Sequence, residues 1–159
     1  MLGYAFQGGG GYGDPLKRDP GAILADFANG HVTEKAAAYY YGVIVKNGSV
    51  DTGATARRRD EIRVERLGTT PTKSMAGGDM RADGGRLACS CGCDLGPWSG
   101  NWKAYALTKV VPPQVYGPHI RIHPDLELRE HICKECGSLL EAEVVRKGEE
   151  SLVTITLDA

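Results

Sequence analysis

Two close pairs of cysteines, roughly forty residues apart, constrain this chain more than any other feature of its sequence. Each pair is followed directly by glycine: Cys89, Cys91 and Gly92 in the first case, and Cys133, Cys136 and Gly137 in the second. Four thiolates suit a tetrahedral zinc ion, and a structural zinc can hold together a module too small for a large core. Thiolate-binding turns need tight backbone, often at positive φ, which glycine adopts at little cost. The second half of the chain is therefore predicted to be a small, β-rich zinc ribbon.

A fifth cysteine, Cys93, leaves the first pair open, because three thiols compete for two places. Cys89 with Cys91 is favoured, since Gly92 then follows its pair as glycine follows the second one. Cys91 with Cys93 is the alternative. Disulfides fit poorly, because the number of cysteines is odd and no basic region with a long apolar run opens the chain. A redox-active dithiol is the other alternative to zinc.

The bulk numbers exclude several classes of function. A chain of 159 residues suits one ordinary domain or two small modules. A net charge of −1 provides no global field that would attract nucleic acid or an anionic membrane. No apolar run approaches the length of a membrane span, so we expect a cytoplasmic protein. Glycine is abundant, with 22 residues, while phenylalanine and tryptophan are scarce, which indicates a thin core that needs a metal or a partner.

The first part of the chain predicts short helices with clear start signals. Asp19 before Pro20 is typical of an N-cap followed by proline at the first helical position, and predicts a helix over 20–28. Thr33 is predicted to cap a second helix over 34–41. The other elements expected here are a loop over 1–18, a strand over 43–45, a turn over 46–48 and a charged helix over 51–63.

The second part predicts strands around the cysteines. Residues 67–86 contain glycine and polar residues with few apolar side chains, which indicates a linker. Strands are expected over 103–108, 126–132, 139–146 and 151–158, with the last two forming a terminal hairpin. The predicted fold class is therefore α+β. The expected domains are a helical and extended arm over 1–66, the linker over 67–86 and the zinc ribbon over 87–159.

Four other features of the sequence could suggest a functional site, but none of them provides a set of catalytic residues. The tract Gly8–Gly13 lacks the Gly-Lys-Ser/Thr of a phosphate loop, so we expect it to pack against a partner. Tyr39–Tyr41 is predicted to pack on another chain, and Arg57–Arg59 to form a solvated or interfacial helix face. His131 is predicted at a strand surface, with a role beside the metal ligands as the alternative. No catalytic residue is predicted, and a zinc with four protein thiolates has no open position for substrate.

Residues 8–59 resemble the carboxy-terminal end of hydantoinase B/5-oxoprolinase-type large subunits. The matching stretches are Gly8-Gly9-Gly10-Gly11-Tyr12-Gly13-Asp14-Pro15, Arg18-Asp19-Pro20, Asp26, Asn29-Gly30, Val32, Ala36-Ala37, Tyr41-Gly42-Val43-Ile44, Gly48, Val50-Asp51 and Ala54-Thr55. In that family the segment closes a chain several times longer. The resemblance implies that most of the large domain comes from another polypeptide.

Residues 87–146 resemble the small gamma subunit of acetone carboxylase. The matching positions are Leu87, Cys89, Cys91-Gly92, Asn101-Trp102-Lys103, Leu128-Arg129-Glu130, Cys133, Cys136-Gly137, Leu139-Leu140, Glu143 and Val144. Cys93 departs from that pattern. A hydantoinase-B-like tail joined to such a ribbon is similar to the small subunits of acetophenone carboxylases.

This combined resemblance implies a subunit of an ATP-dependent, biotin-independent complex that carboxylates acetophenone with bicarbonate to benzoylacetate. ATP and Mg would then be bound by hydantoinase-A-like large subunits, and a hydantoinase-B-like large subunit would receive the arm. This chain would be non-catalytic, with zinc on Cys89, Cys91, Cys133 and Cys136. The alternatives are an accessory subunit of a hydantoin or oxoproline hydrolase, or of a carboxylase for another ketone. A nucleic-acid-binding ribbon would need a basic face, which the many carboxylates oppose.

Overall fold

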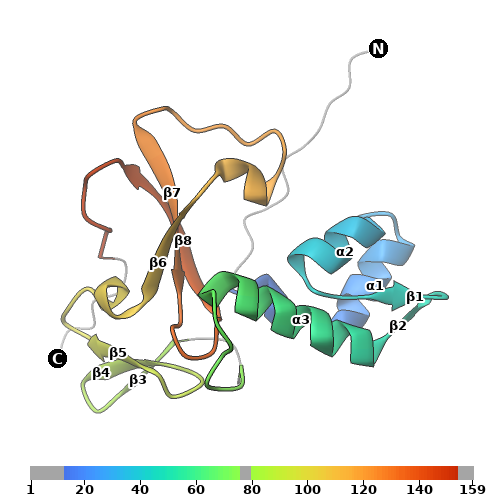
Figure 1. The fold of residues 1–159 in the computed structure, drawn as a ribbon, viewed down its shortest axis with the longest axis horizontal. Helices are drawn as coiled ribbons and strands as arrows, with labels where there is room; N and C mark the ends of the chain where they lie inside the picture. Colours follow the sequence, from blue (N-terminus) through green and yellow to red (C-terminus); the bar gives the residue numbers. More distant parts are fainter. Residues whose placement is uncertain (1–12, 76–79, 154–159) are drawn as a thin grey trace.

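The fold is α+β, as predicted, in a computed structural model that describes residues 13–75 and 80–153. Within these residues the chain forms three α-helices and eight strands, and the strands make three small antiparallel sheets (Figure 1). Figure 1 shows helix α3 extending from the helical N-terminal part toward the sheets of the C-terminal part. The helical part and the β-rich part are described in turn below.

The first two helices follow their capping signals. Helix α1, Pro20–Ala28, begins after Asp19, whose side chain accepts a hydrogen bond from the Ala22 amide at 2.9 Å. Helix α2, Glu34–Tyr40, begins after Thr33, which accepts from the Ala36 amide at 3.1 Å. Both helices therefore lie where the sequence predicted them, and α2 ends one residue earlier than expected.

A two-stranded hairpin follows and completes a small apolar core. Strands β1, Val45–Lys46, and β2, Ser49–Val50, are joined by Asn47 and Gly48. Both joining residues have positive φ, which matches the twist of a tight hairpin turn. The predicted strand over 43–45 starts only at its last residue. The buried side chains here are Ile23, Ala37, Val43 and Val45.

Helix α3, Thr52–Leu67, is the longest element and runs four residues beyond the prediction. It ends at Gly68, whose φ of 72° is left-handed. Near its start the Thr55 hydroxyl accepts from the Ile44 amide at 3.0 Å. Arg59 donates to the Tyr41 carbonyl at 3.1 Å, while Arg58 pairs with surface glutamates. Within the arginine run, Arg59 thus contacts the backbone that follows α2, whereas Arg58 lies on the solvated face of α3.

Two three-stranded sheets form the rest of the structure. The first contains β3, Met80–Asp83, β4, Arg86–Cys89, and β5, Asp94–Pro97, in that order. The second contains β6, Leu107–Val111, β7, Leu126–Ile132, and β8, Leu139–Arg146, again in that order. Short 3-10 helices occur at Pro15–Lys17, Trp102–Tyr105 and Pro113–Tyr116. A register shift at His131 and Ile132 lies where β7 approaches the second cysteine pair.

Three parts of the strand prediction differ from the structure. Strand β3 lies inside the predicted linker, where Met80 packs against the core around the cysteines. Residues 103–105 were expected in a strand but belong to a 3-10 turn, because the Asn101 side chain accepts from the Lys103 amide at 3.2 Å. Strand β8 pairs with β7 rather than with a terminal strand. Residues 151–153 are not in a strand, and 154–158 lie outside the described residues.

The described helices give no sign of a membrane span. None of them in residues 13–75 and 80–153 combines the length and the apolar character that crossing a bilayer requires. Of the glycine-rich tract, 8–12 lie outside the described residues. In the tyrosine run, Tyr39 is half exposed at 52% and stacks edge-on against Tyr40. The prediction that this run packs on another chain remains a prediction.

Candidate metal centre

The structure brings four of the five cysteines together. The sulfur atoms of Cys89, Cys91, Cys133 and Cys136 all lie within 4.8 Å of one another. The Sγ atoms of Cys89 and Cys136 are 3.7 Å apart, and those of Cys91 and Cys133 are 3.6 Å apart. A tetrahedral zinc ion with Zn–S bonds of about 2.3 Å requires sulfur atoms about 3.8 Å apart. The four thiols therefore fit a tetrahedral metal ion.

Each cysteine pair is held by a tight turn that a glycine amide closes, over three residues in the first pair and over four in the second. In the first, the Gly92 amide donates to the Cys89 carbonyl at 2.7 Å, and in the second the Gly137 amide donates to the Cys133 carbonyl at 2.9 Å. Both glycines have positive φ, 85° and 75°. The sequence predicts positive φ at these two glycines, because a tight thiolate-binding turn favours it. We call these turns the first and second knuckles, residues 89–92 and 133–137.

Cys93 lies outside this group of four. Its side chain is 1% exposed, and its sulfur points to the Asp94 carbonyl at 3.7 Å. Its carbonyl accepts from the Cys89 amide at 2.8 Å, so its backbone helps to close the first knuckle. The geometry thus favours Cys89 with Cys91 over Cys91 with Cys93. The ligand assignment itself stays a prediction that metal analysis must test.

The environment of the four thiols differs from site to site. Cys89, Cys133 and Cys136 are fully buried, and Cys91 is half-buried. Hydrogen bonds from Cys133 and then Cys89 lower the pKa of Cys136, while burial raises the pKa of Cys91 to about 12. Thiols bind metal as thiolates, so uptake of a metal ion releases protons from such a group.

Apolar side chains pack around the group. Leu87, Leu95 and Trp102 are buried against the cysteines, and Met80, Trp98 and Leu140 pack around them. An ion in this position would hold β4, β5 and the end of β7 in one core. Such an ion would be structural, because four cysteines would fill its coordination sphere.

A buried ionic cluster lies beside this core, and few features of the sequence point to it. The Lys103 ammonium contacts Glu141 and Glu143, each at 2.7 Å, and its side chain is only 1% exposed. The His131 Nε2 donates to the Glu143 carboxylate at 2.8 Å, and its Nδ1 lies 3.0 Å from the Thr108 hydroxyl. The surface position predicted for His131 is therefore wrong, because this face of β7 is covered and the ring is completely buried.

The charge states of this cluster follow from its contacts. Burial opposes ionisation of Glu143, but hydrogen bonds from Lys103, Ser151 and His131 outweigh it and lower its pKa to about 2. Burial lowers the pKa of His131 despite its bond to Glu143. Glu143 is therefore ionised and balances Lys103. The one sequence signal is the alternation of Glu141 and Glu143 along a single strand.

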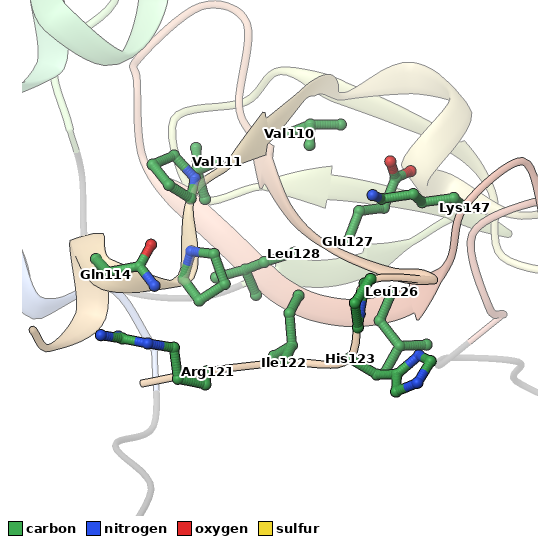
Figure 2. A pocket seen from close by; sticks show the side chains of 13 residues that line it. Val110, Val111, Gln114, Arg121, Ile122, His123, Leu126, Glu127, Leu128 and Lys147 are labelled. Carbon is green, nitrogen blue, oxygen red and sulfur yellow. The ribbon is translucent and has the colours of Figure 1, made fainter. Parts of the chain in front are cut away.

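A shallow groove of about 460 Å³ lies beside β6 and β7, away from the cysteines. Figure 2 shows Ile122, Leu126 and Leu128 along it, with Arg121 and Gln114 at one end and His123 and Lys147 at the other. The Arg121 guanidinium and the Gln114 amide are already bonded to backbone carbonyls of the same loop. The lining thus offers an apolar surface without a nucleophile and base in contact among the described residues.

The chain is similar to parts of three large enzyme subunits. It is 44% identical over 66 residues to the acetone carboxylase alpha subunit of Xanthobacter autotrophicus, which is 38% of this chain and 8% of that relative. It is 49% identical over 53 residues to the beta subunit of the caprolactamase of Pseudomonas jessenii, 33% of this chain and 9% of the relative. It is 46% identical over 37 residues to the B subunit of a putative D-/L-hydantoinase of a Pseudomonas species, 23% and 6% respectively.

These matches limit what can be transferred. The chain spans less than a tenth of the length of each of these relatives. No protein-family model matches it. The similarity therefore establishes partial homology to subunits of carboxylase, caprolactamase and hydantoinase enzymes. Together with the four-thiol group, it forms the basis for a functional proposal.

Proposed function

We propose that this chain is a non-catalytic, zinc-binding structural subunit of a multi-subunit, ATP-dependent ketone carboxylase. One observation carries the proposal: a chain with partial homology to a carboxylase alpha subunit also carries a largely buried group of four thiols that fits a metal ion. The ion would be zinc on Cys89, Cys91, Cys133 and Cys136. With no coordination position left for water or substrate, it would stabilise the fold and not take part in the reaction.

The arm would supply a missing piece of a hydantoinase-B-like large subunit. The resemblance of 8–59 to the end of such subunits supports this, and so does the exposed ring of Tyr39. A hydantoinase-A-like large subunit would bind ATP and Mg. In the most specific form of the proposal, the complex carboxylates acetophenone with bicarbonate to benzoylacetate.

A second candidate keeps the assembly and changes the reaction. The chain could belong to an ATP-dependent hydrolase of the hydantoinase or oxoprolinase type, or to a carboxylase for another ketone. The similarity to a caprolactamase and to a putative hydantoinase favours this candidate. Fold and metal geometry are the same in both cases, so only substrate tests separate them.

The test is reconstitution with and without this chain. Hydantoinase-A-like and hydantoinase-B-like large subunits from the same source would be co-expressed with it and purified. ATP-dependent fixation of labelled bicarbonate would be measured with acetophenone and acetone, and amide hydrolysis with hydantoin and 5-oxoproline. We expect fixation with a ketone only when this chain is present. Failure to copurify with either large subunit, or turnover by this chain alone, would contradict the proposal.

A further inference from the structure

Three consecutive carbonyls of the second knuckle accept hydrogen bonds from outside the ribbon. The Glu135 carbonyl accepts from the Thr72 and Lys73 amides at 2.9 and 3.1 Å. The Cys136 carbonyl accepts from the Arg63 guanidinium at 2.6 Å, and the Gly137 carbonyl accepts from Arg66 at 3.1 Å. These donors belong to the C-terminal end of α3 or to the segment just after it. At the first knuckle, the backbone hydrogen bonds outside the strand ladders join Cys89 to Gly92 and to Cys93, and Cys89 itself pairs with Met80 of β3.

Arg63 is the centre of this contact. Its side chain is buried to 10% exposure, and its other two nitrogens donate to the Lys73 carbonyl at 2.6 Å and to Asp60 at 2.8 Å. Its stem also lies directly against Gly137. A Cβ added at that glycine would be 3.0 Å from the Arg63 Cβ and 3.2 Å from its carbonyl oxygen. The second knuckle therefore has its shape set on one side by α3.

A second contact reinforces the first. Arg66 pairs with the buried carboxylate of Asp14 at 2.7 Å, and the same carboxylate accepts from the Leu139 amide at 2.8 Å. Asp14 thereby joins the beginning of the arm to the residues that follow the second knuckle. A buried backbone group that loses its hydrogen-bond partner destabilises the fold, because its desolvation is no longer compensated.

We infer that Arg63 is a positioning residue for the metal centre, so that α3 and the bound ion stabilise each other. This inference rests on the metal site of the proposed function. Four thiolates around a divalent ion carry a net charge of about −2, which favours a buried guanidinium nearby. Arg63 holds the Cys136 carbonyl, and with it the backbone that presents two of the four sulfurs. Coupling of this kind is reciprocal: what α3 contributes to metal affinity, the metal contributes to α3.

The experiment compares Arg63→Met with Arg58→Met in the full 159-residue chain. Arg58 lies on the same helix but pairs with Glu61 and Glu65, at 3.0 and 2.9 Å, so its variant is the matched control. Zinc affinity would be measured by competition with a chromogenic chelator. We expect Arg63→Met to weaken zinc binding by about 10- to 100-fold, as loss of such outer contacts generally does, and Arg58→Met to leave it unchanged. The cobalt form of Arg63→Met should keep the absorption bands of four thiolates, because no ligand is altered.

Two further measurements decide the inference if Arg63→Met folds poorly. Arg63→Lys keeps a positive charge and one donor and should give an intermediate affinity. Chelation of the metal from the unaltered chain should speed amide hydrogen exchange in the last two turns of α3 more than in α1. Wild-type affinity in both Arg63 variants, or unchanged exchange in α3, would overturn the inference and leave the metal site intact. An unaltered chain that takes up no zinc would overturn the metal site and this inference together.

Discussion

The described residues of the predicted arm, 13–66, and of the predicted ribbon, 87–153, are stabilised in different ways. The arm buries a small apolar core of Ile23, Ala37, Val43 and Val45, and its helices begin at side-chain caps. The ribbon buries groups that need a partner in the core: three of the four clustered thiols, the Lys103 ammonium and the His131 ring. Polar groups in a core stabilise it only when every partner is present.

This difference means that the two regions should fail under different conditions. The apolar core of the arm depends on packing, which is nearly independent of pH and of metal. The ribbon depends on partners that can be removed one at a time: an ion, a carboxylate or a proton. The contact of α3 with the second knuckle links the two regions, so the comparison is sharpest between elements outside that contact, such as α1 and β6.

Cys133→Ser should have the largest effect. Loss of one thiolate should abolish tight zinc binding and unfold the ribbon strands, because metal binding supplies on the order of ten kcal/mol to small zinc modules. The loss of zinc would be measured by elemental analysis, and the unfolding of the strands by amide protection in NMR. Helices α1 and α2 should keep more of their protection than β7 and β8.

The matched control is Cys93→Ala, since Cys93 is buried beside the site but lies outside the group of four. This variant should retain one zinc ion per chain. If instead Cys93→Ala loses the ion and Cys89→Ala keeps it, the alternative pair Cys91 and Cys93 would be correct.

Lys103→Met should be the next largest change. It leaves Glu141 and Glu143 without their buried cation, and breaking a buried ion pair from one side typically destabilises by about 3–5 kcal/mol. Urea unfolding of the zinc-loaded chain would measure it. Lys134→Met, at an exposed position in the second knuckle, is the control and should differ little from the unaltered chain. Equal urea midpoints for Lys103→Met and Lys134→Met would mean that the buried ionic cluster contributes nothing to the stability of the fold.

The arm could be predicted almost element by element because its signals are local. Asp19, Thr33 and Asp51 each accept a hydrogen bond from an amide three residues ahead, which depends on no distant residue. The cysteine spacing was equally informative, because ligand chemistry allows few arrangements of four thiols.

The ribbon was predicted less well because its decisive contacts are distant in sequence. The burial of His131 follows from pairing β7 with β6 and β8, and Lys103 meets its carboxylates about forty residues along the chain. Strand β3 was assigned to a linker since only Met80 marks it as a core element. No local pattern specifies such pairings.

Ile23→Ala tests whether the arm can be destabilised without affecting the metal centre. Ile23 is completely buried, and removing its branched side chain from a small core should destabilise the arm by about 2–5 kcal/mol. Amide exchange should rise in α1, α2 and the β1–β2 hairpin, while zinc content and the affinity of the ribbon for the ion should change little. A loss of zinc as large as that in Cys133→Ser would show that the two regions form one cooperative unit.

The smallest expected effect is a dependence on pH that comes from Glu143 in the ribbon. Its contacts lower the pKa of Glu143 to about 2, below the value of about 4.3 that a glutamate has in an unfolded chain. A group with a lowered pKa contributes stability that is fully present above the unfolded value and is lost as pH falls toward the folded one. The contribution of Glu143 should therefore decline between about pH 5 and pH 2.

Glu143→Gln separates this contribution from the protonation of the thiols, which weakens metal binding in both proteins alike. The difference in unfolding free energy between the unaltered chain and Glu143→Gln, measured by urea at a series of pH values, should be largest near about pH 6. It should narrow steadily as the solution is acidified, because the unaltered carboxylate then becomes neutral like the amide. Ile23→Ala should show a constant difference over the same range, since no titrating group is removed. A difference for Glu143→Gln that is equally constant would mean that this buried carboxylate is not stabilised by its charge.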